Sequence, residues 1–155
     1  NPITLQDLMT LEDYDKARNS FRQEVMERKK NRLALIGPDV VLSFEDRTTI
    51  LYQIQEMLRV ERIFIRAGIQ AELDAYNPLI PDGSNWKATM MIQIPDVASR
   101  RQALTRLVGI ESLCWVRVED HDRVYAIADE DMERTTEDKT SAVHFLRFEL
   151  YLVLC

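Results

Sequence analysis

The sequence contains few of the residues that build common catalytic and metal sites. Among its 155 residues are only two cysteines, two histidines and four glycines. Cys114 and Cys155 belong to no CxxC pair, which excludes a cysteine-rich zinc site and leads us to expect free thiols. The phosphate-binding patterns GxGxxG and GxxxxGK[ST] are missing, as are the zinc pattern HExxH and a nucleophile elbow. The sequence therefore predicts no particular reaction, cofactor or metal, and it leaves open whether the protein is an enzyme.

Long apolar runs and an excess of basic charge are missing as well. No run approaches the ~20 apolar residues of a membrane-spanning helix, and no secretory signal is visible. We therefore expect a cytoplasmic protein that does not bind a membrane. The net charge of −6 argues against nucleic-acid binding as the main task. An RNA-binding alternative rests only on the basic residues between Arg28 and Arg32.

What the sequence does contain is a series of helical patterns followed mainly by strand patterns. Helical periodicity and capping residues predict helices near residues 4–8, over 11–31, over 47–67 and over 96–107. Apolar segments bounded by turn residues predict strands over 33–36, 40–45, 87–94 and 143–154, and a hairpin over 110–128. These elements predict a single α+β domain over residues 1–155. Its sheet is expected to be mostly antiparallel with about five or six strands, and the N-terminal and central helices are expected to pack on it.

The predicted central helix over residues 47–67 carries charges that an ordinary scaffold helix would avoid. Asp46 or Thr48 can cap its start, and Gly68 is the expected stop signal. One apolar stripe of this helix is formed by Ile50, Ile54, Met57, Leu58, Phe64 and Ile65. Glu61 falls within this stripe, so its carboxylate is expected to lose water and to need a cation, a metal ion or a proton. A structural ion pair is the more ordinary interpretation of such a residue.

Further charged residues complete a candidate ligand site. Arg59, Arg62 and Arg66 have the spacing of one helical ridge, which can bind phosphate or carboxylate groups or be neutralised within the protein. His144 shares an apolar strand face, where a hydrogen-bonded core histidine is the common case. The predicted ligand-binding residues, which are charged or carry an imidazole, are Glu56, Arg59, Glu61, Arg62, His144, Arg147 and Glu149. The acidic residues over 129–138 could join this site, although such runs usually face solvent.

Self-association is a further expectation. The apolar terminal strand and Trp115 could complete a sheet across a two-fold axis, so we expect a homo-oligomer.

Several long strings of residues resemble one bacterial family. They are PITLQDLMTLEDY, YQIQEMLRVERIF, ELDAYNPLIPDGSNWKATMMI, IADEDMER and KTSAVHFLRFEL. Together they resemble domain of unknown function family 3501, which is found mostly in proteobacteria. Genes of this family often lie beside genes for rubrerythrin-like di-iron proteins and iron–sulphur oxidoreductases. The resemblance implies a non-catalytic accessory or partner protein of a redox or peroxide-defence system, and it implies no catalytic residues. The alternative is a small-ligand or metal-binding enzyme that uses a carboxylate and arginine pocket around the central helix.

Overall fold

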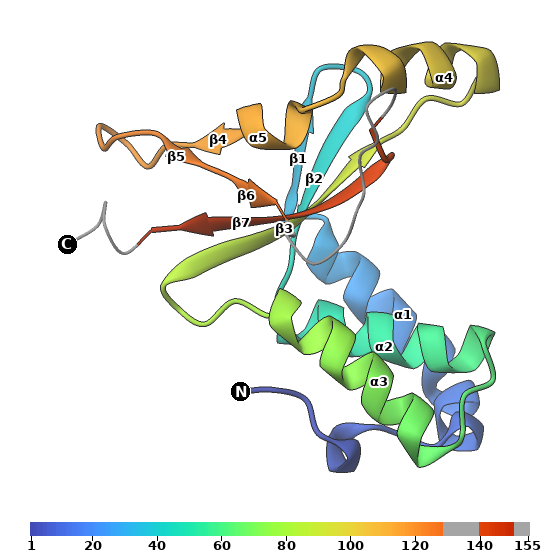
Figure 1. Ribbon diagram of the computed structural model, residues 1–155. Helices are drawn as coiled ribbons and strands as arrows, with labels where there is room; N and C mark the ends of the chain where they lie inside the picture. Colours follow the sequence, from blue (N-terminus) through green and yellow to red (C-terminus); the bar gives the residue numbers. More distant parts are fainter. Residues whose placement is uncertain (129–139, 151–155) are drawn as a thin grey trace. The chain divides into compact units, whose positions relative to one another are not determined.

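The computed structural model describes residues 1–128 and 140–150 (Figure 1). These residues form helices, a five-stranded antiparallel sheet and a small two-stranded sheet, which confirms the predicted α+β fold class. The chain divides into two compact units, one of residues 1–32 and 45–82 and one of residues 33–44 and 83–155. The single domain over residues 1–155, with its helices packed on the sheet, stays a prediction. No helix among the described residues is long and apolar enough to cross a membrane.

The first unit, which we call the helical unit, contains the predicted N-terminal and central helices. Its elements are η1 (Leu5–Asp7), α1 (Leu11–Lys29), α2 (Arg47–Val60), α3 (Arg66–Tyr76) and η2 (Asn77–Leu79). The side chain of Thr10 accepts a hydrogen bond from the Asp13 N–H at 3.1 Å, so α1 begins with a capped turn. Asp46 caps α2 in the same way, through the Thr49 N–H at 2.9 Å. The local capping signals in the sequence therefore give both helix starts correctly.

The side-chain amides of Gln55, which is buried, and Asn77, which is half-buried, attach the N-terminal segment to the helices of this unit. The Met9 N–H donates to Gln55 Oε1 of α2 at 2.7 Å. The Ile3 N–H donates to Asn77 Oδ1 at 2.7 Å, and Asn77 Nδ2 donates back to the Ile3 carbonyl at 2.9 Å. Ile3 is thereby held in the apolar core, together with the buried residues Ile50, Ile54, Leu58 and Leu73.

The prediction of one continuous helix over residues 47–67 is wrong, because α2 ends at Val60. The Ile63 N–H donates to the Leu58 carbonyl at 2.9 Å and the Arg62 N–H donates to the Arg59 carbonyl at 3.3 Å. This pair of bonds is a Schellman motif, whose left-handed position is occupied here by Arg62 with φ of 53°. Gly68, the expected stop signal, lies inside α3. A Cβ at Gly68 would lie 2.8 Å from Ile63 Cγ2, so this glycine allows α3 to approach the turn closely.

The second unit, the sheet unit, contains strands in the order β1-β2-β3-β7-β6, and every neighbouring pair is antiparallel. Its elements are β1 (Leu33–Ile36), β2 (Val40–Phe44), β3 (Asn85–Ile92), α4 (Val97–Arg106), α5 (Ile110–Leu113), β4 (Trp115–Val116), β5 (Val124–Tyr125), β6 (Ile127–Ala128) and β7 (Val143–Glu149). The buried residues of its core are Leu42, Ala88, Met90, Leu146 and Phe148. These residues alternate along β2, β3 and β7, as strands with one buried face require.

The strand and hairpin predictions for the sheet unit are confirmed in part. The predicted strands over residues 33–36 and 40–45 correspond to β1 and β2, and β4 pairs with β5 as a hairpin. The start of the predicted hairpin is wrong, since Ile110–Leu113 is the short helix α5. Gly109, with φ of 88°, precedes it in the left-handed conformation expected of a helix stop after α4. The predicted last strand continues beyond residue 150, outside the described residues.

Candidate functional site

The structure places the predicted ligand-binding residues in both units. Glu56, Arg59, Glu61 and Arg62 belong to the helical unit, and His144, Arg147 and Glu149 belong to the sheet unit. Binding of a ligand by these residues stays a prediction. The local surroundings of each residue nevertheless show which charges already have partners.

Glu56 forms the main polar link between α1 and α2. Its carboxylate accepts hydrogen bonds from Arg18, with Nε at 3.2 Å from Oε1 and 3.0 Å from Oε2, and Nη2 at 2.9 Å from Oε1. It also accepts one from the Tyr52 hydroxyl at 2.9 Å. The hydrogen bonds from Arg18 outweigh the effect of burial and hold the pKa of Glu56 below its ordinary value. Glu56 therefore has the environment of a structural ion pair.

Aromatic side chains surround this ion pair. The Tyr14 and Tyr52 rings each contact Phe21 edge to face, at centroid distances of 6.3 and 5.8 Å. The Tyr14 hydroxyl is buried beside Glu56 without adequate hydrogen-bond geometry to any described atom. Burial, and then the negative charge of Glu56, raise the pKa of Tyr14. Around Glu56, the contact between α1 and α2 is therefore formed by aromatic rings, and the carboxylate accepts hydrogen bonds from Arg18 and Tyr52.

The prediction that Glu61 is buried in an apolar stripe is wrong. Glu61 is the C-cap residue of α2 and is exposed, because the helix and its stripe end one residue earlier. The negative charge of Glu61 acts on Glu72 of α3. The pKa of Glu72 is raised first by burial and then by this charge. No buried carboxylate in need of a ligand exists at position 61.

The predicted ridge of three arginines is also interrupted by the end of α2. Arg59 lies in the last turn of α2, Arg62 lies in the Schellman turn, and Arg66 is the first residue of α3. Residues spaced by three and four positions lie on one ridge only when they belong to the same helix. The prediction of a single three-arginine ridge is therefore wrong.

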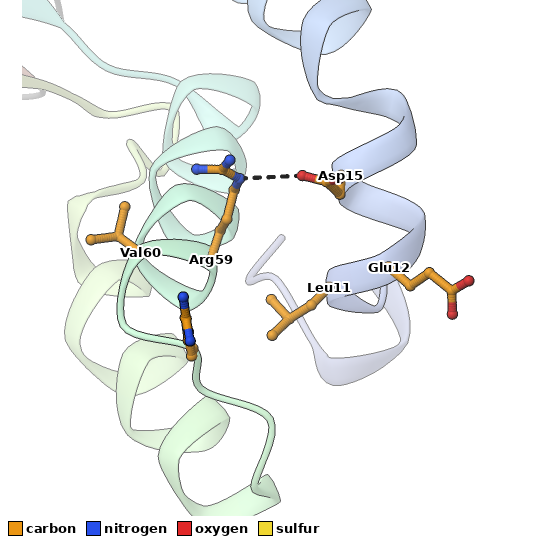
Figure 2. Close-up of a pocket in the computed structure, with 6 residues that line it drawn as sticks. Leu11, Glu12, Asp15, Arg59 and Val60 are labelled. Atoms are coloured by element: carbon orange, nitrogen blue, oxygen red, sulfur yellow. Dashed lines mark ion pairs between the residues drawn. The ribbon is translucent and has the colours of Figure 1, made fainter.

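Two of these arginines nevertheless meet at a cavity between the start of α1 and the end of α2. The cavity has a volume of about 490 Å³ and is lined by Leu11, Glu12, Asp15, Arg59, Val60 and Arg62. Figure 2 shows the Arg59 side chain extending from α2 towards Asp15 on α1, whereas the Glu12 carboxylate points away. Arg59 Nε lies 3.6 Å from Asp15 Oδ1, which makes an ion pair but is too long for a hydrogen bond. Nε is buried and, among the described residues, has no hydrogen-bond partner.

Exposed apolar side chains follow this cavity along the chain. Val60, which lines the cavity, has 71% of its surface exposed, and the corresponding fractions are 75% for Phe64 and 67% for Ile65. We call Val60, Phe64 and Ile65 the junction patch, since they occupy the junction between α2 and α3. Sequence reasoning missed it, because the predicted continuous helix assigned Phe64 and Ile65 to a buried stripe.

In the sheet unit, His144 has the environment of a core residue, as expected from its apolar strand face. It is buried, and its Nε2 lies 2.8 Å from Thr140 Oγ1 and 3.0 Å from the Ser141 carbonyl oxygen. Arg147 forms an ion pair with Glu149 at 2.5 Å, and Asn85 Nδ2 donates to Glu149 at 3.1 Å. These three predicted site residues are thus engaged with protein groups.

The acidic residues over 129–138 lie outside the described residues. Across residues 1–128 and 140–150, no group of three or more histidine, cysteine, aspartate or glutamate side chains is placed to hold a metal ion.

Comparison with known proteins assigns the chain to a family. Residues 2–152 match the model of the family described as "Protein of unknown function (DUF3501)". A crystal structure of a novel protein of unknown function from Burkholderia pseudomallei K96243 is 57% identical, with a TM-score of 0.91. The alignment covers 97% of this chain and 78% of that chain. No curated protein matches the chain. The family match confirms the resemblance found in the sequence: the chain belongs to the DUF3501 family.

Proposed function

We propose that the protein is a non-catalytic accessory protein that binds a partner protein through the junction patch. The observation that carries this proposal is the exposure of Val60, Phe64 and Ile65, at 71, 75 and 67%. Adjacent exposed apolar side chains are a feature of protein interaction sites. Burying one such side chain against a partner contributes about 1.5–3 kcal/mol through the hydrophobic effect.

The turn that contains Val60 and directly precedes Phe64 has a backbone that is fixed before a partner arrives. The Schellman hydrogen bonds hold residues 58–63, and the Ile63 side chain packs against the core of the helical unit. A surface that is already ordered loses little conformational entropy on binding. The junction patch therefore supports a docking role without a rearrangement of the unit.

The proposed partners follow from the family resemblance, which points to rubrerythrin-like di-iron proteins and iron–sulphur oxidoreductases in oxidative defence. Affinity capture with purified candidates of both classes tests this identity, using the wild-type chain, Phe64→Ser and the control Leu113→Ser. Leu113 is 71% exposed but belongs to the sheet unit, so it matches Phe64 in exposure and differs in place. We expect capture by the wild type and the control, and loss of capture by Phe64→Ser.

Two outcomes of this capture experiment count against the proposal in different ways. Capture of neither class by the wild type rejects the redox partners. Equal capture by the wild type and both variants rejects the junction patch as the docking surface, whatever the partner is.

A second candidate function is a small-ligand-binding enzyme centred on the cavity beside the patch. Arg59 and Arg62 line this cavity and can bind an anionic ligand. Thermal unfolding in the presence of phosphate, acetate or glutarate tests this candidate. A rise in melting temperature that Arg59→Gln abolishes supports it, and identical melting in all these anions rejects it.

A further inference from the structure

We infer that the junction patch recognises an acidic segment of its partner, with a carboxylate bound by Arg59 and Arg62 and an adjacent apolar side chain packed on Phe64. The inference rests on the docking function proposed above and adds the chemistry that the partner must carry. It follows from an incomplete neutralisation of positive charge at the end of α2, next to exposed apolar side chains.

Arg59 has capacity for another acceptor. Its contact with Asp15 is 3.6 Å long, and the two side chains are 39% and 70% exposed. Ion pairs between groups this exposed are weak, so Asp15 can turn into solvent at little cost. A carboxylate that replaces Asp15 could accept two parallel hydrogen bonds from the guanidinium group, including one from Nε, which is now unsatisfied.

Arg62 supplies a second positive charge at the same cavity. It forms no ion pair with any residue of the described ranges, 1–128 and 140–150. Its backbone has the left-handed conformation in which glycine is favoured. An arginine at this position brings a positive charge to the cavity at a cost in backbone energy.

The negative charges around the cavity do not cancel this attraction. Glu12 points away from the cavity and has Lys16 Nζ at 3.5 Å from its carboxylate. Asp15 is the acidic side chain that contacts Arg59, so it competes directly with a carboxylate of the partner. Removal of the Asp15 charge should therefore strengthen binding of that carboxylate.

Apolar side chains at and near the cavity determine which apolar residue the partner's segment must carry. Leu11 and Val60 form apolar walls of the cavity, and Phe64 follows Arg62 by two residues. A partner side chain next to the bound carboxylate can therefore contact these residues while the carboxylate contacts the two arginines. The matching chemistry is an aspartate or glutamate beside an aromatic or large aliphatic residue.

The inference is tested by titration with two capped dipeptides that differ in one charge, N-acetyl-Asp-Phe-amide and N-acetyl-Asn-Phe-amide. Binding is followed by nuclear magnetic resonance of the Arg59 Nε–H group. The aspartyl peptide should bind about fivefold or more tightly than the asparaginyl peptide, because charge-assisted hydrogen bonds are the stronger ones. Asp15→Asn should tighten binding of the aspartyl peptide, and Phe64→Ser should weaken both peptides. The control Glu27→Gln should leave both affinities unchanged, because it removes a carboxylate of α1 that is paired with Lys30 and does not line the cavity.

Several outcomes overturn the inference. Equal affinity for the two peptides, or no binding of either, removes carboxylate recognition. If partner capture still depends on Phe64 in that case, the proposed docking function survives. Loss of that dependence as well removes both. A second copy of this chain is the other candidate for the occupant of the junction patch, and light scattering at the titration concentration tests it. A dimer that Phe64→Ser converts to a monomer would make the second copy the binding partner and would overturn the inference.

Discussion

Glu56 and Arg59 lie three residues apart on α2, yet their charges are treated in opposite ways. Glu56 faces α1 within an aromatic cluster and accepts hydrogen bonds from Arg18 and Tyr52. Arg59, one turn later, has only a 3.6 Å contact with Asp15 and an unsatisfied Nε. Glu56 therefore stabilises the contact between α1 and α2, whereas Arg59, at the open end of α2, can still bind a ligand. We expect mutations at the two positions to affect different measurements.

The largest expected effect separates the two positions by stability. Glu56→Gln removes the negative charge and leaves Arg18 without its partner, so the free energy of unfolding should fall by about 2 kcal/mol. Arg59→Gln removes only a long ion pair and should change the free energy of unfolding by less than about 0.5 kcal/mol. Urea unfolding at pH 7 measures both values. Equal effects of the two substitutions would contradict the comparison.

The pH dependence of stability tests the ion pair of Glu56 separately. The pKa of Glu56 is lower in the folded protein than its ordinary value of 4.5, because Arg18 stabilises the charged form. This group therefore contributes stability that is present above pH 4.5 and is lost as the pH falls through its lower folded value. Glu56→Gln should lose less stability than the wild type over this acidic range. A parallel loss in both proteins would exclude Glu56 as a source of the pH dependence.

A smaller effect is expected at Tyr14, inside the same aromatic cluster. Its hydroxyl is buried without hydrogen-bond geometry, so Tyr14→Phe removes a desolvated polar group and keeps the ring that contacts Phe21. The free energy of unfolding should rise by up to about 1 kcal/mol. A lower free energy of unfolding for Tyr14→Phe, measured by urea denaturation, would show that the hydroxyl donates to Glu56 in solution.

A small gain in stability is expected at Arg62, beside the cavity. Arg62→Gly places the favoured residue in the left-handed position of the Schellman turn, with φ of 53°. The free energy of unfolding should rise by about 0.5 kcal/mol, since relief of backbone strain is partly offset by the greater freedom of glycine in the unfolded chain. Thermal and urea unfolding measure this value. A loss of stability would mean that the Arg62 side chain makes a structural contact.

Local sequence signals predicted much of the fold. Thr10 and Asp46 cap their helices as expected, Gly109 ends the turn after α4, and alternation identifies β2. These features depend on residues within a few positions of one another, so one sequence contains the information. The fold class followed from the order of such elements.

The candidate site could be predicted only in part, because its geometry depends on a turn and on distant pairs. The left-handed residue that ends α2 is Arg62, whereas the sequence rule looks for glycine and found Gly68 instead. The partners of Glu56 and Gln55 lie 38 and 46 residues away, at Arg18 and Met9, and no local pattern indicates such pairs. Arg59 and Arg62 were recognised by their charge, but the cavity that joins them to α1 requires the fold.

The role of positive charge at the end of α2 is tested by measuring peptide affinity and stability on the same variant, Arg62→Gly. We predict that N-acetyl-Asp-Phe-amide binds Arg62→Gly several-fold more weakly than it binds the wild type. The free energy of unfolding of Arg62→Gly should equal or exceed that of the wild type. The advantage of the aspartyl over the asparaginyl peptide should shrink accordingly. Unchanged affinity for the aspartyl peptide in a fully folded Arg62→Gly protein would contradict the claim that charge at the open end of α2 serves binding.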